Sequence, residues 1–301
     1  MENQVDRFRP RRSVLYMPGA NERALEKAKT LAADSLILDL EDAVAPEAKE
    51  MARAQVVAAV KAGGYGHREV VIRVNELDTP WSEADIAAAV RVVPDAILVP
   101  KVSSGDEVRQ ITDMLRSAGL NEATQLWVMI ETPRAILEIS EIAAASNDPV
   151  IPLTCLVLGT NDLAKETGAS LSKDRFGVQS WLSMCVCAAR AHGLHILDGV
   201  FNDFKDKEGF EAECRQGALL GMDGKTLIHP GQIAGANIVF SPKEREVIWA
   251  RKVIEAFAQP ENAGRGVITV DGQMVELLHA ELAHKTVAVA DAIDQLSAAE
   301  T

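Results

Sequence analysis

Short apolar runs recur along the chain, and each is followed by a stretch with the 3.6-residue periodicity of an amphipathic helix. Near-continuous apolar runs of this length are typical of parallel strands that are covered on both faces. The pattern predicts eight strands, at residues 13–18, 35–42, 69–75, 96–101, 125–131, 155–162, 195–200 and 225–230. The segments between them, rich in Ala, Glu, Lys and Leu, predict helices, among them 21–33, 47–62, 82–92, 105–118 and 133–145.

Eight alternating strand–helix units in under ~250 residues favour an α/β (β/α)8 TIM barrel over an open doubly wound sheet. No GxGxxG follows the first strand, which argues further against a dinucleotide-binding fold. The stretch "AQPENAGRG" (258–266) is typical of a linker, and 267–297 predicts a short β-turn and a helix. We therefore expect a catalytic barrel at 10–257 and, at 258–301, a linker with a C-terminal helical extension or lid.

Polar residues gather at the carboxyl ends of the predicted strands, where a barrel of this kind assembles its active site. The amino ends carry no comparable set. The polar residues at the carboxyl ends are, in chain order, Asp39, Glu41 and Asp42, then Arg73 and Asn75, then Lys101, Glu131, Asn161 with Asp162, Asp198 and His229.

Several carboxylates that converge on one mouth repel one another, and a divalent cation would relieve this repulsion. Oxygen ligands favour a hard ion, Mg²⁺ or Mn²⁺. Glu131 and Asp162 close adjacent predicted strands, and two carboxylates leave coordination positions open for substrate oxygens. The alternative is that strand-end carboxylates cap the following helices. A zinc site is not expected, because the six histidines show no ligand spacing.

Arg73 lies late in the apolar run "VIRVN", and a buried cation needs a partner. One reading is a salt bridge to Glu41 or Asp42. The other is a bidentate clamp on a substrate carboxylate or on an emerging oxyanion, and the two are compatible. His229 is weaker evidence for catalysis, because lone histidines more often satisfy backbone groups.

Composition narrows the function classes. The chain has 301 residues, a net charge of −13 and no basic block, which argues against nucleic acid or an anionic membrane as the partner. The four cysteines form no CxxC pair, which is typical of reduced thiols. No signal peptide and no run of ~20 apolar residues is present, so we expect a cytoplasmic protein.

These motifs carry a family likeness. The opening "SVLYMPGANERALEKAKTLAADSLILDLEDAVAPEAKEMAR" is followed in order by "IRVNELDTPW", "VPKV", "MIETPRA", "LGTNDLA" and "GKTLIHPGQI". The string resembles the CitE-like (citrate lyase β-subunit-like, malyl-CoA lyase) group of the HpcH/HpaI aldolase superfamily, from about residue 10 to 295. The resemblance implies a TIM barrel, Mg²⁺ dependence and a homotrimer or homohexamer.

The resemblance also implies roles for individual positions. Arg73 would bind substrate, and Glu41 and Asp42 would form an acidic pair behind the metal site. The remaining matches are Glu131 and Asp162 as Mg²⁺ ligands, and Tyr16 and Lys27 as contacts of coenzyme A.

One position departs from the family pattern. The C-terminal motif usually resembles GxMxD, and its aspartate serves a neighbouring subunit's site as acid or base. Here the match is "DGQMVE", so Glu276 stands where Asp is usual. The longer side chain moves the carboxylate, and an offset near ~1 Å can cost ~100-fold in rate.

The resemblance implies a Mg²⁺-dependent acyl-CoA lyase. Retro-Claisen cleavage of a 3-hydroxyacyl-CoA of the malyl-CoA, methylmalyl-CoA or citramalyl-CoA type would yield acetyl-CoA or propionyl-CoA and a 2-oxo acid such as glyoxylate. One alternative is a (3S)-malyl-CoA-type thioesterase on the same scaffold, for which Glu276 is the only hint. Another is a citrate lyase β-type subunit that is active only in a complex.

Overall fold

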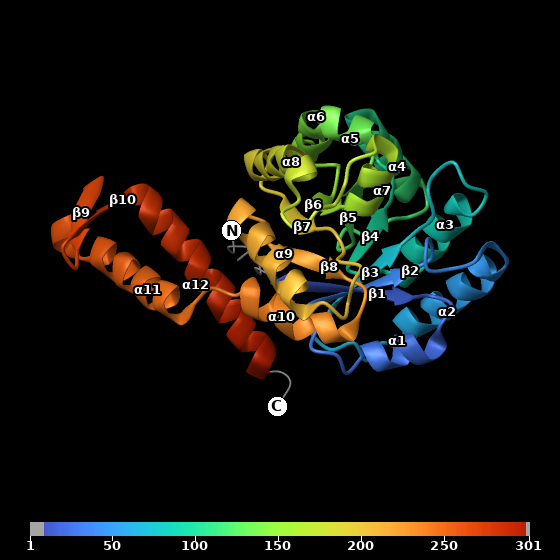
Figure 1. Ribbon diagram of the computed structural model, residues 1–301, viewed down its shortest axis with the longest axis horizontal. Helices are drawn as coiled ribbons and strands as arrows, with labels where there is room; N and C mark the ends of the chain where they lie inside the picture. Colours follow the sequence, from blue (N-terminus) through green and yellow to red (C-terminus); the bar gives the residue numbers. More distant parts are fainter. Residues whose placement is uncertain (1–8, 299–301) are drawn as a thin grey trace. The chain divides into compact units, whose positions relative to one another are not determined.

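The computed structural model describes residues 9–298, and its larger unit, Arg11–Phe240, is a closed barrel of parallel strands (Figure 1). Each strand pairs with the next along the chain, and β8 pairs back with β1, so the predicted TIM barrel is confirmed. The strands are β1 Ser13–Pro18, β2 Ser35–Asp39, β3 Glu69–Arg73, β4 Ala96–Val99, β5 Gln125–Ile130, β6 Leu153–Leu158, β7 His195–Asp198 and β8 Gly224–Leu227.

Most strands end one to four residues before the predicted position. The polar residues that the prediction included, such as Glu41, Asn75 and Asp162, lie just beyond the parallel ladder in the loops and first helical turns. The prediction therefore extended most strands into the loops and helical turns that follow them, which are the segments that carry the site in a barrel of this kind.

Helices surround the barrel (Figure 1), with short 3₁₀ turns between several of them. The predicted helix 133–145 is divided at Glu138, whose φ of −103° and ψ of 12° are not helical. Across residues 9–298, no helix combines the length and apolar character needed to span a bilayer. The helices are α1 Glu22–Ala28, α2 Lys49–Ala62, α3 Ser82–Val92, α4 Gly105–Ser117, α5 Pro133–Leu137, α6 Ile139–Ala144, α7 Thr160–Thr167, α8 Gln179–Ala191, α9 Lys207–Leu220 and α10 Ile233–Val239. The 3₁₀ turns are η1 Pro46–Ala48, η2 Ala145–Asn147, η3 Phe176–Val178 and η4 Pro230–Gln232.

Strand alternation determines which side chains enter the barrel. Leu36 and Leu38 belong to the large core cluster that includes residues of the surrounding helices. Ile37 belongs to a separate cluster that is formed almost entirely by residues of the barrel strands. Because residues two apart in a strand share a face, Asp39 lies on the same face as Ile37. Arg73 lies opposite Asp39 in the β2–β3 register, so the two charges are neighbours at the carboxyl end of the barrel.

The second unit contains residues from Ser241 onward and has its own apolar cluster, in which Val253 and Ile268 are buried. Its elements are α11 Glu244–Ala258, η5 Pro260–Asn262, β9 Val267–Val270, β10 Gln273–Glu276 and α12 Leu277–Ala298. Helix α11 packs against α12 here, whereas the division expected from the sequence placed it with the barrel. Asp271 and Gly272 both have positive φ, as a two-residue type I′ hairpin requires.

Candidate active site

A cavity of about 300 Å³ opens at the carboxyl end of the barrel. Its polar lining comes from the ends of several different strands, which is the usual construction of a TIM-barrel active site. The polar and charged lining residues are Tyr16, Asp39, Asp42, Arg73, Glu131, Asn161, Asp162, Asn202 and Thr226.

Arg73 is the buried cation of this cavity, with 5% of its surface exposed. Its Nε and Nη2 donate to the two carboxylate oxygens of Asp39, at 2.6 and 2.7 Å. Its Nη1 lies 2.6 Å from Oε2 of Glu41, as an ion pair without hydrogen-bond geometry, and 3.4 Å from Oδ2 of Asp42. The predicted contacts with Glu41 and Asp42 are therefore present, but the bidentate partner is Asp39.

Asp39 is itself held by the loop that follows it. Its carboxylate accepts hydrogen bonds from the backbone N–H groups of Glu41 and Ala43, at 2.9 and 3.1 Å. Burial alone would raise the pKa of Asp39, but the Arg73 guanidinium and the two N–H groups outweigh it and hold this pKa below its usual range. The Asp39–Arg73 pair is therefore a fixed ion pair, and it fixes the direction of the guanidinium.

Tyr16 and Met129 complete the surroundings of Arg73. The guanidinium carbon lies 4.7 Å from the centre of the Tyr16 ring, within cation–π range. The Tyr16 hydroxyl donates to Sδ of Met129 at 3.9 Å, and Nη1 of Arg73 is 3.7 Å from the same sulfur. Burial raises the pKa of Tyr16, so the phenol is neutral at physiological pH.

Glu131 belongs to the acidic lining of the cavity and is 2% exposed. Its Oε1 accepts the backbone N–H of Lys101 at 2.8 Å, and Lys101 holds a left-handed backbone with φ of 57°. Burial, followed by the charges of Glu41 and Asp162, raises the pKa of Glu131 to about 8. Burial and the neighbouring acids also raise the pKa of Glu41 to about 7. The site therefore contains carboxylates whose charges the protein alone does not balance.

The donor set fits a hard divalent cation. Glu131 and Asp162 both line the cavity, and the negative charge near Glu131 adds to the effect of burial on its pKa, which a cation would oppose. A Cβ at Gly159 would overlap the Glu131 carboxylate, so the chain leaves room for that group. Within residues 9–298 no cluster of three or more His, Cys, Asp or Glu is arranged to hold a metal. A cation at this pair of carboxylates would therefore need water or substrate for its other coordination positions.

We expect the affinity for Mg²⁺ or Mn²⁺ to rise with pH up to about 8 and then to level off. The cation requires ionised Glu131, whose pKa is raised to about 8, so below that value a proton must leave as the cation binds. One displaced proton weakens the apparent affinity by about tenfold per pH unit. Calorimetric titration with Mn²⁺ from about pH 6 to about pH 9 measures this, and a flat affinity would contradict it.

We expect Gly159→Ala to weaken Mn²⁺ binding by about 10- to 100-fold, the range found when the groups supporting a metal ligand are disturbed. The added methyl would meet the Glu131 carboxylate and displace it. Gly177→Ala is the matched control, because a Cβ there meets only an ordinary contact with the Ser170 carbonyl. Equal affinity in both variants would show that Gly159 does not shape the site.

Other residues predicted from the sequence lie elsewhere. Lys27 lies on the exposed surface of α1 and does not line the cavity, and Glu276 ends β10 in the second unit. Asp198 is fully buried in ion pairs with Arg175 and Lys225. The His229 ring accepts the backbone N–H of Gly231, which is the backbone role considered from the sequence.

Sequence reasoning missed part of the lining. Met129 points inward two residues before Glu131, as the alternation of β5 would have indicated. Asn202 was also missed, and it exchanges two amide hydrogen bonds, at 3.1 and 2.9 Å, with the predicted Asn161. They are separated by 41 positions, and no local pattern in the sequence connects them.

Comparison with known proteins finds a matching family, similar sequences and a similar solved structure. The family described as HpcH/HpaI aldolase/citrate lyase matches residues 12–230. A (3S)-malyl-CoA thioesterase of Cereibacter sphaeroides is 50% identical over 94% of this chain and 96% of its own. An L-malyl-CoA/beta-methylmalyl-CoA lyase of the same species is 34% identical over 95% and 96%. CitE from Mycobacterium tuberculosis, solved with magnesium, acetoacetate and coenzyme A, matches with a TM-score of 0.69 and 29% identity over 92% of this chain and 97% of that one.

Proposed function

Because the chain belongs to the HpcH/HpaI aldolase/citrate lyase family, we propose that it is a Mg²⁺-dependent thioesterase for a 3-hydroxyacyl-CoA of the (3S)-malyl-CoA type. The observation that carries the choice of reaction is the identity of 50% to a relative named as this thioesterase, against 34% to one named as a lyase. The sequence placed the lyase first and the thioesterase as the alternative. The higher identity to the thioesterase supports the opposite order of preference.

Arg73 is the group proposed to stabilise negative charge on the thioester oxygen. Its guanidinium lines the cavity, and Asp39 fixes it through two hydrogen bonds before substrate arrives. A donor that is already oriented needs no reorganisation when the oxyanion forms, and removing one such donor typically costs ~10²–10³ in rate. Glu41 and Asp42, which both pair with Nη1 of Arg73, remain the proposed acidic pair behind the metal site.

Glu131 and Asp162 are proposed to hold the divalent cation. A cation there would supply positive charge for the carboxylate and hydroxyl oxygens of the hydroxy-acid end of the substrate. The same ion would balance the charges that raise the pKa of Glu131. Tyr16, which lines the cavity, and Lys27, on α1, remain the proposed contacts of coenzyme A.

Hydrolysis then proceeds by addition and elimination. A water oxygen bonds to the thioester carbon, and the carbonyl electron pair moves to the oxygen that faces Arg73. A carboxylate takes the water proton, and we propose Glu276 of a neighbouring subunit for this role, on the family resemblance. The electron pair returns, the C–S bond breaks, and the thiolate leaves and takes up a proton. The homotrimer or homohexamer and the cytoplasmic location likewise remain proposals.

The second candidate is the carbon–carbon lyase, and the relative named L-malyl-CoA/beta-methylmalyl-CoA lyase favours it. Loss of the substrate's hydroxyl proton would let the C–C bond break, giving a 2-oxo acid and the enolate of acetyl-CoA or propionyl-CoA. Arg73 would then stabilise the enolate oxygen, and Glu276 would return a proton to its carbon. The two reactions share their binding groups and differ in the bond that breaks.

The deciding experiment incubates the purified protein and Mg²⁺ with malyl-CoA, methylmalyl-CoA, citramalyl-CoA and citryl-CoA separately. Free thiol and acyl-CoA species are followed together. Free CoA with intact hydroxy acid, lost on adding EDTA, supports the thioesterase. Acetyl-CoA or propionyl-CoA with a 2-oxo acid supports the lyase instead. No turnover of any free thioester would contradict both and favour a subunit that is active only in a complex.

A further inference from the structure

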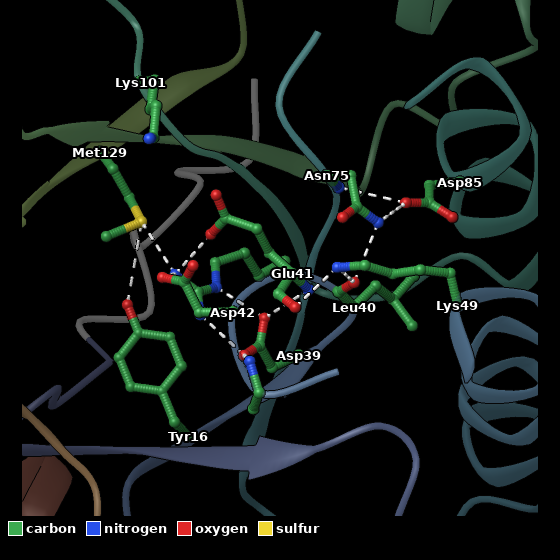
Figure 2. A network of polar contacts seen from close by, with 12 residues as sticks. Tyr16, Asp39, Leu40, Glu41, Asp42, Lys49, Asn75, Asp85, Lys101 and Met129 are labelled. Carbon is green, nitrogen blue, oxygen red and sulfur yellow. Dashed lines mark hydrogen bonds and ion pairs between the residues drawn. The ribbon is translucent and has the colours of Figure 1, made fainter. Parts of the chain in front are cut away.

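A buried lysine lies directly behind the acidic loop of the cavity. Lys49 is the first residue of α2 and is 6% exposed. Its Nζ donates to the backbone carbonyls of Leu40 and Glu41, at 2.9 and 2.7 Å (Figure 2). The ring of Trp81 lies 5.3 Å from the same nitrogen, within cation–π range. The ammonium is thus directed at two carbonyls of one loop and an aromatic face.

A second buried group supports the same carbonyl. Nδ2 of Asn75 donates to the Leu40 carbonyl at 2.9 Å and also to Oδ2 of Asp85 (Figure 2). The other oxygen of Asp85 pairs with Nε of Arg53 at 2.6 Å. Groups from α2, from the end of β3 and from α3 therefore converge on the loop that follows β2.

The loop is consequently held from two sides. On the cavity side, the N–H of Glu41 donates to Asp39, which holds Arg73. On the opposite side, the carbonyl of the same residue accepts from Lys49. A shift of the Glu41 backbone would move its carboxylate and alter the support of Asp39 together.

Burying an ammonium is costly unless its hydrogen bonds are satisfied, and an apolar residue often packs as well or better at such a position. The ammonium of Lys49 donates to the backbone carbonyls of Leu40 and Glu41. If the loop were open, water could make these hydrogen bonds to the two carbonyls in place of Lys49. The arrangement therefore points to precise placement of the loop, since stability alone does not require a cation there.

We propose that Lys49 is a positioning residue of the active site. By holding the carbonyls of Leu40 and Glu41, it keeps Glu41 and the Asp39–Arg73 pair in the geometry that receives the thioester oxygen. The identification of the bound oxygen as that of a thioester rests on the proposed function. The placement of the loop by Lys49 does not depend on it.

The first test compares Lys49→Met with Arg11→Met. Arg11 is a matched control, because it is also a buried cation, 5% exposed and paired with Glu69 at 2.7 Å, but it lies at the amino end of the barrel. At a temperature where both variants are folded, Lys49→Met is expected to lower kcat by about 100-fold, as a misplacement near ~1 Å can. Arg11→Met is expected to lower only Tm. A kcat of Lys49→Met equal to that of the control would overturn the proposal.

Chemical rescue separates positioning from packing. Lys49→Ala removes the three methylenes and the ammonium that n-propylammonium would replace. Added n-propylammonium is expected to restore part of kcat, whereas tetramethylammonium, which has no N–H donor, is not. Equal effects of the two ions would show that the carbonyl contacts are not what activity requires.

Hydrogen exchange tests the loop without any assumption about the reaction. Amides of residues 40–48 are expected to exchange faster in Lys49→Met than in wild type, and at the wild-type rate in Arg11→Met. If Lys49→Met does not fold, Lys49→Gln, which keeps one donor group, takes its place. Wild-type protein that turns over no thioester would contradict the proposed function, and the exchange result would still decide the role of Lys49. Exchange at the wild-type rate in both variants would overturn the proposed positioning role of Lys49.

Discussion

Glu131→Gln is expected to lower kcat/KM by about 10³-fold, because it removes a proposed cation ligand that contributes several kcal/mol of charge stabilisation. Mn²⁺ binding measured by calorimetry should be lost in parallel. Glu122→Gln, an exposed loop position, is the control that should match wild type in both assays. Activity that stays near the wild-type level would remove Glu131 from the metal site.

The same variant should not be destabilised in the absence of metal. The folded-state pKa of Glu131 is raised to about 8, above its value in the unfolded chain. The folded state therefore binds the proton more tightly, and stability falls as pH rises from the unfolded pKa through the folded one. The neutral amide of Gln avoids this loss. With EDTA present at about pH 9, Tm of Glu131→Gln should equal or exceed that of wild type, and a clear decrease would contradict the charge argument.

Asp198→Asn is expected to destabilise the protein by about 3–5 kcal/mol, because it leaves buried cations without their shared partner. Asp198 is fully buried, with Oδ1 at 2.6 Å from Arg175 and Oδ2 at 3.0 Å from Nζ of Lys225. Glu213, 2.6 Å from Lys225, compensates only in part. Urea titration measures the loss of free energy of unfolding.

The control is Asp291→Asn, which breaks an exposed pair with Arg251 and should cost under about 1 kcal/mol. The Asp198 contribution should also depend on pH. Burial alone would raise the pKa of Asp198, but Lys225 and Arg175 outweigh it and lower this pKa. The stabilisation is therefore present above the unfolded pKa near ~3.9 and is lost as pH falls through the folded one. A similar loss in both variants would contradict a special role for the buried network.

Local patterns in the sequence were sufficient for the barrel. Eight apolar runs alternate with amphipathic segments, and each run became a strand, because burial on both faces is a property of the run itself. The predicted carboxyl ends of most strands were too late, since the boundary between a strand such as β2 and the loop after it depends on where the barrel opens. The same patterns predicted the mouth of the barrel as the site, and Arg73 and Glu131 line the cavity there.

The sequence by itself determined the fold and the charged strand-end residues, several of which line the cavity, because strand periodicity and strand-end chemistry are local. Only the tertiary structure decided which charges pair. Asp39 became the bidentate partner of Arg73 because β2 and β3 are adjacent in register. Lys49, in a helix, and Asn75, at the end of a strand, meet at one carbonyl of the loop after β2 because the fold brings these segments together. Such partnerships depend on distances between segments, which no local pattern in the chain encodes.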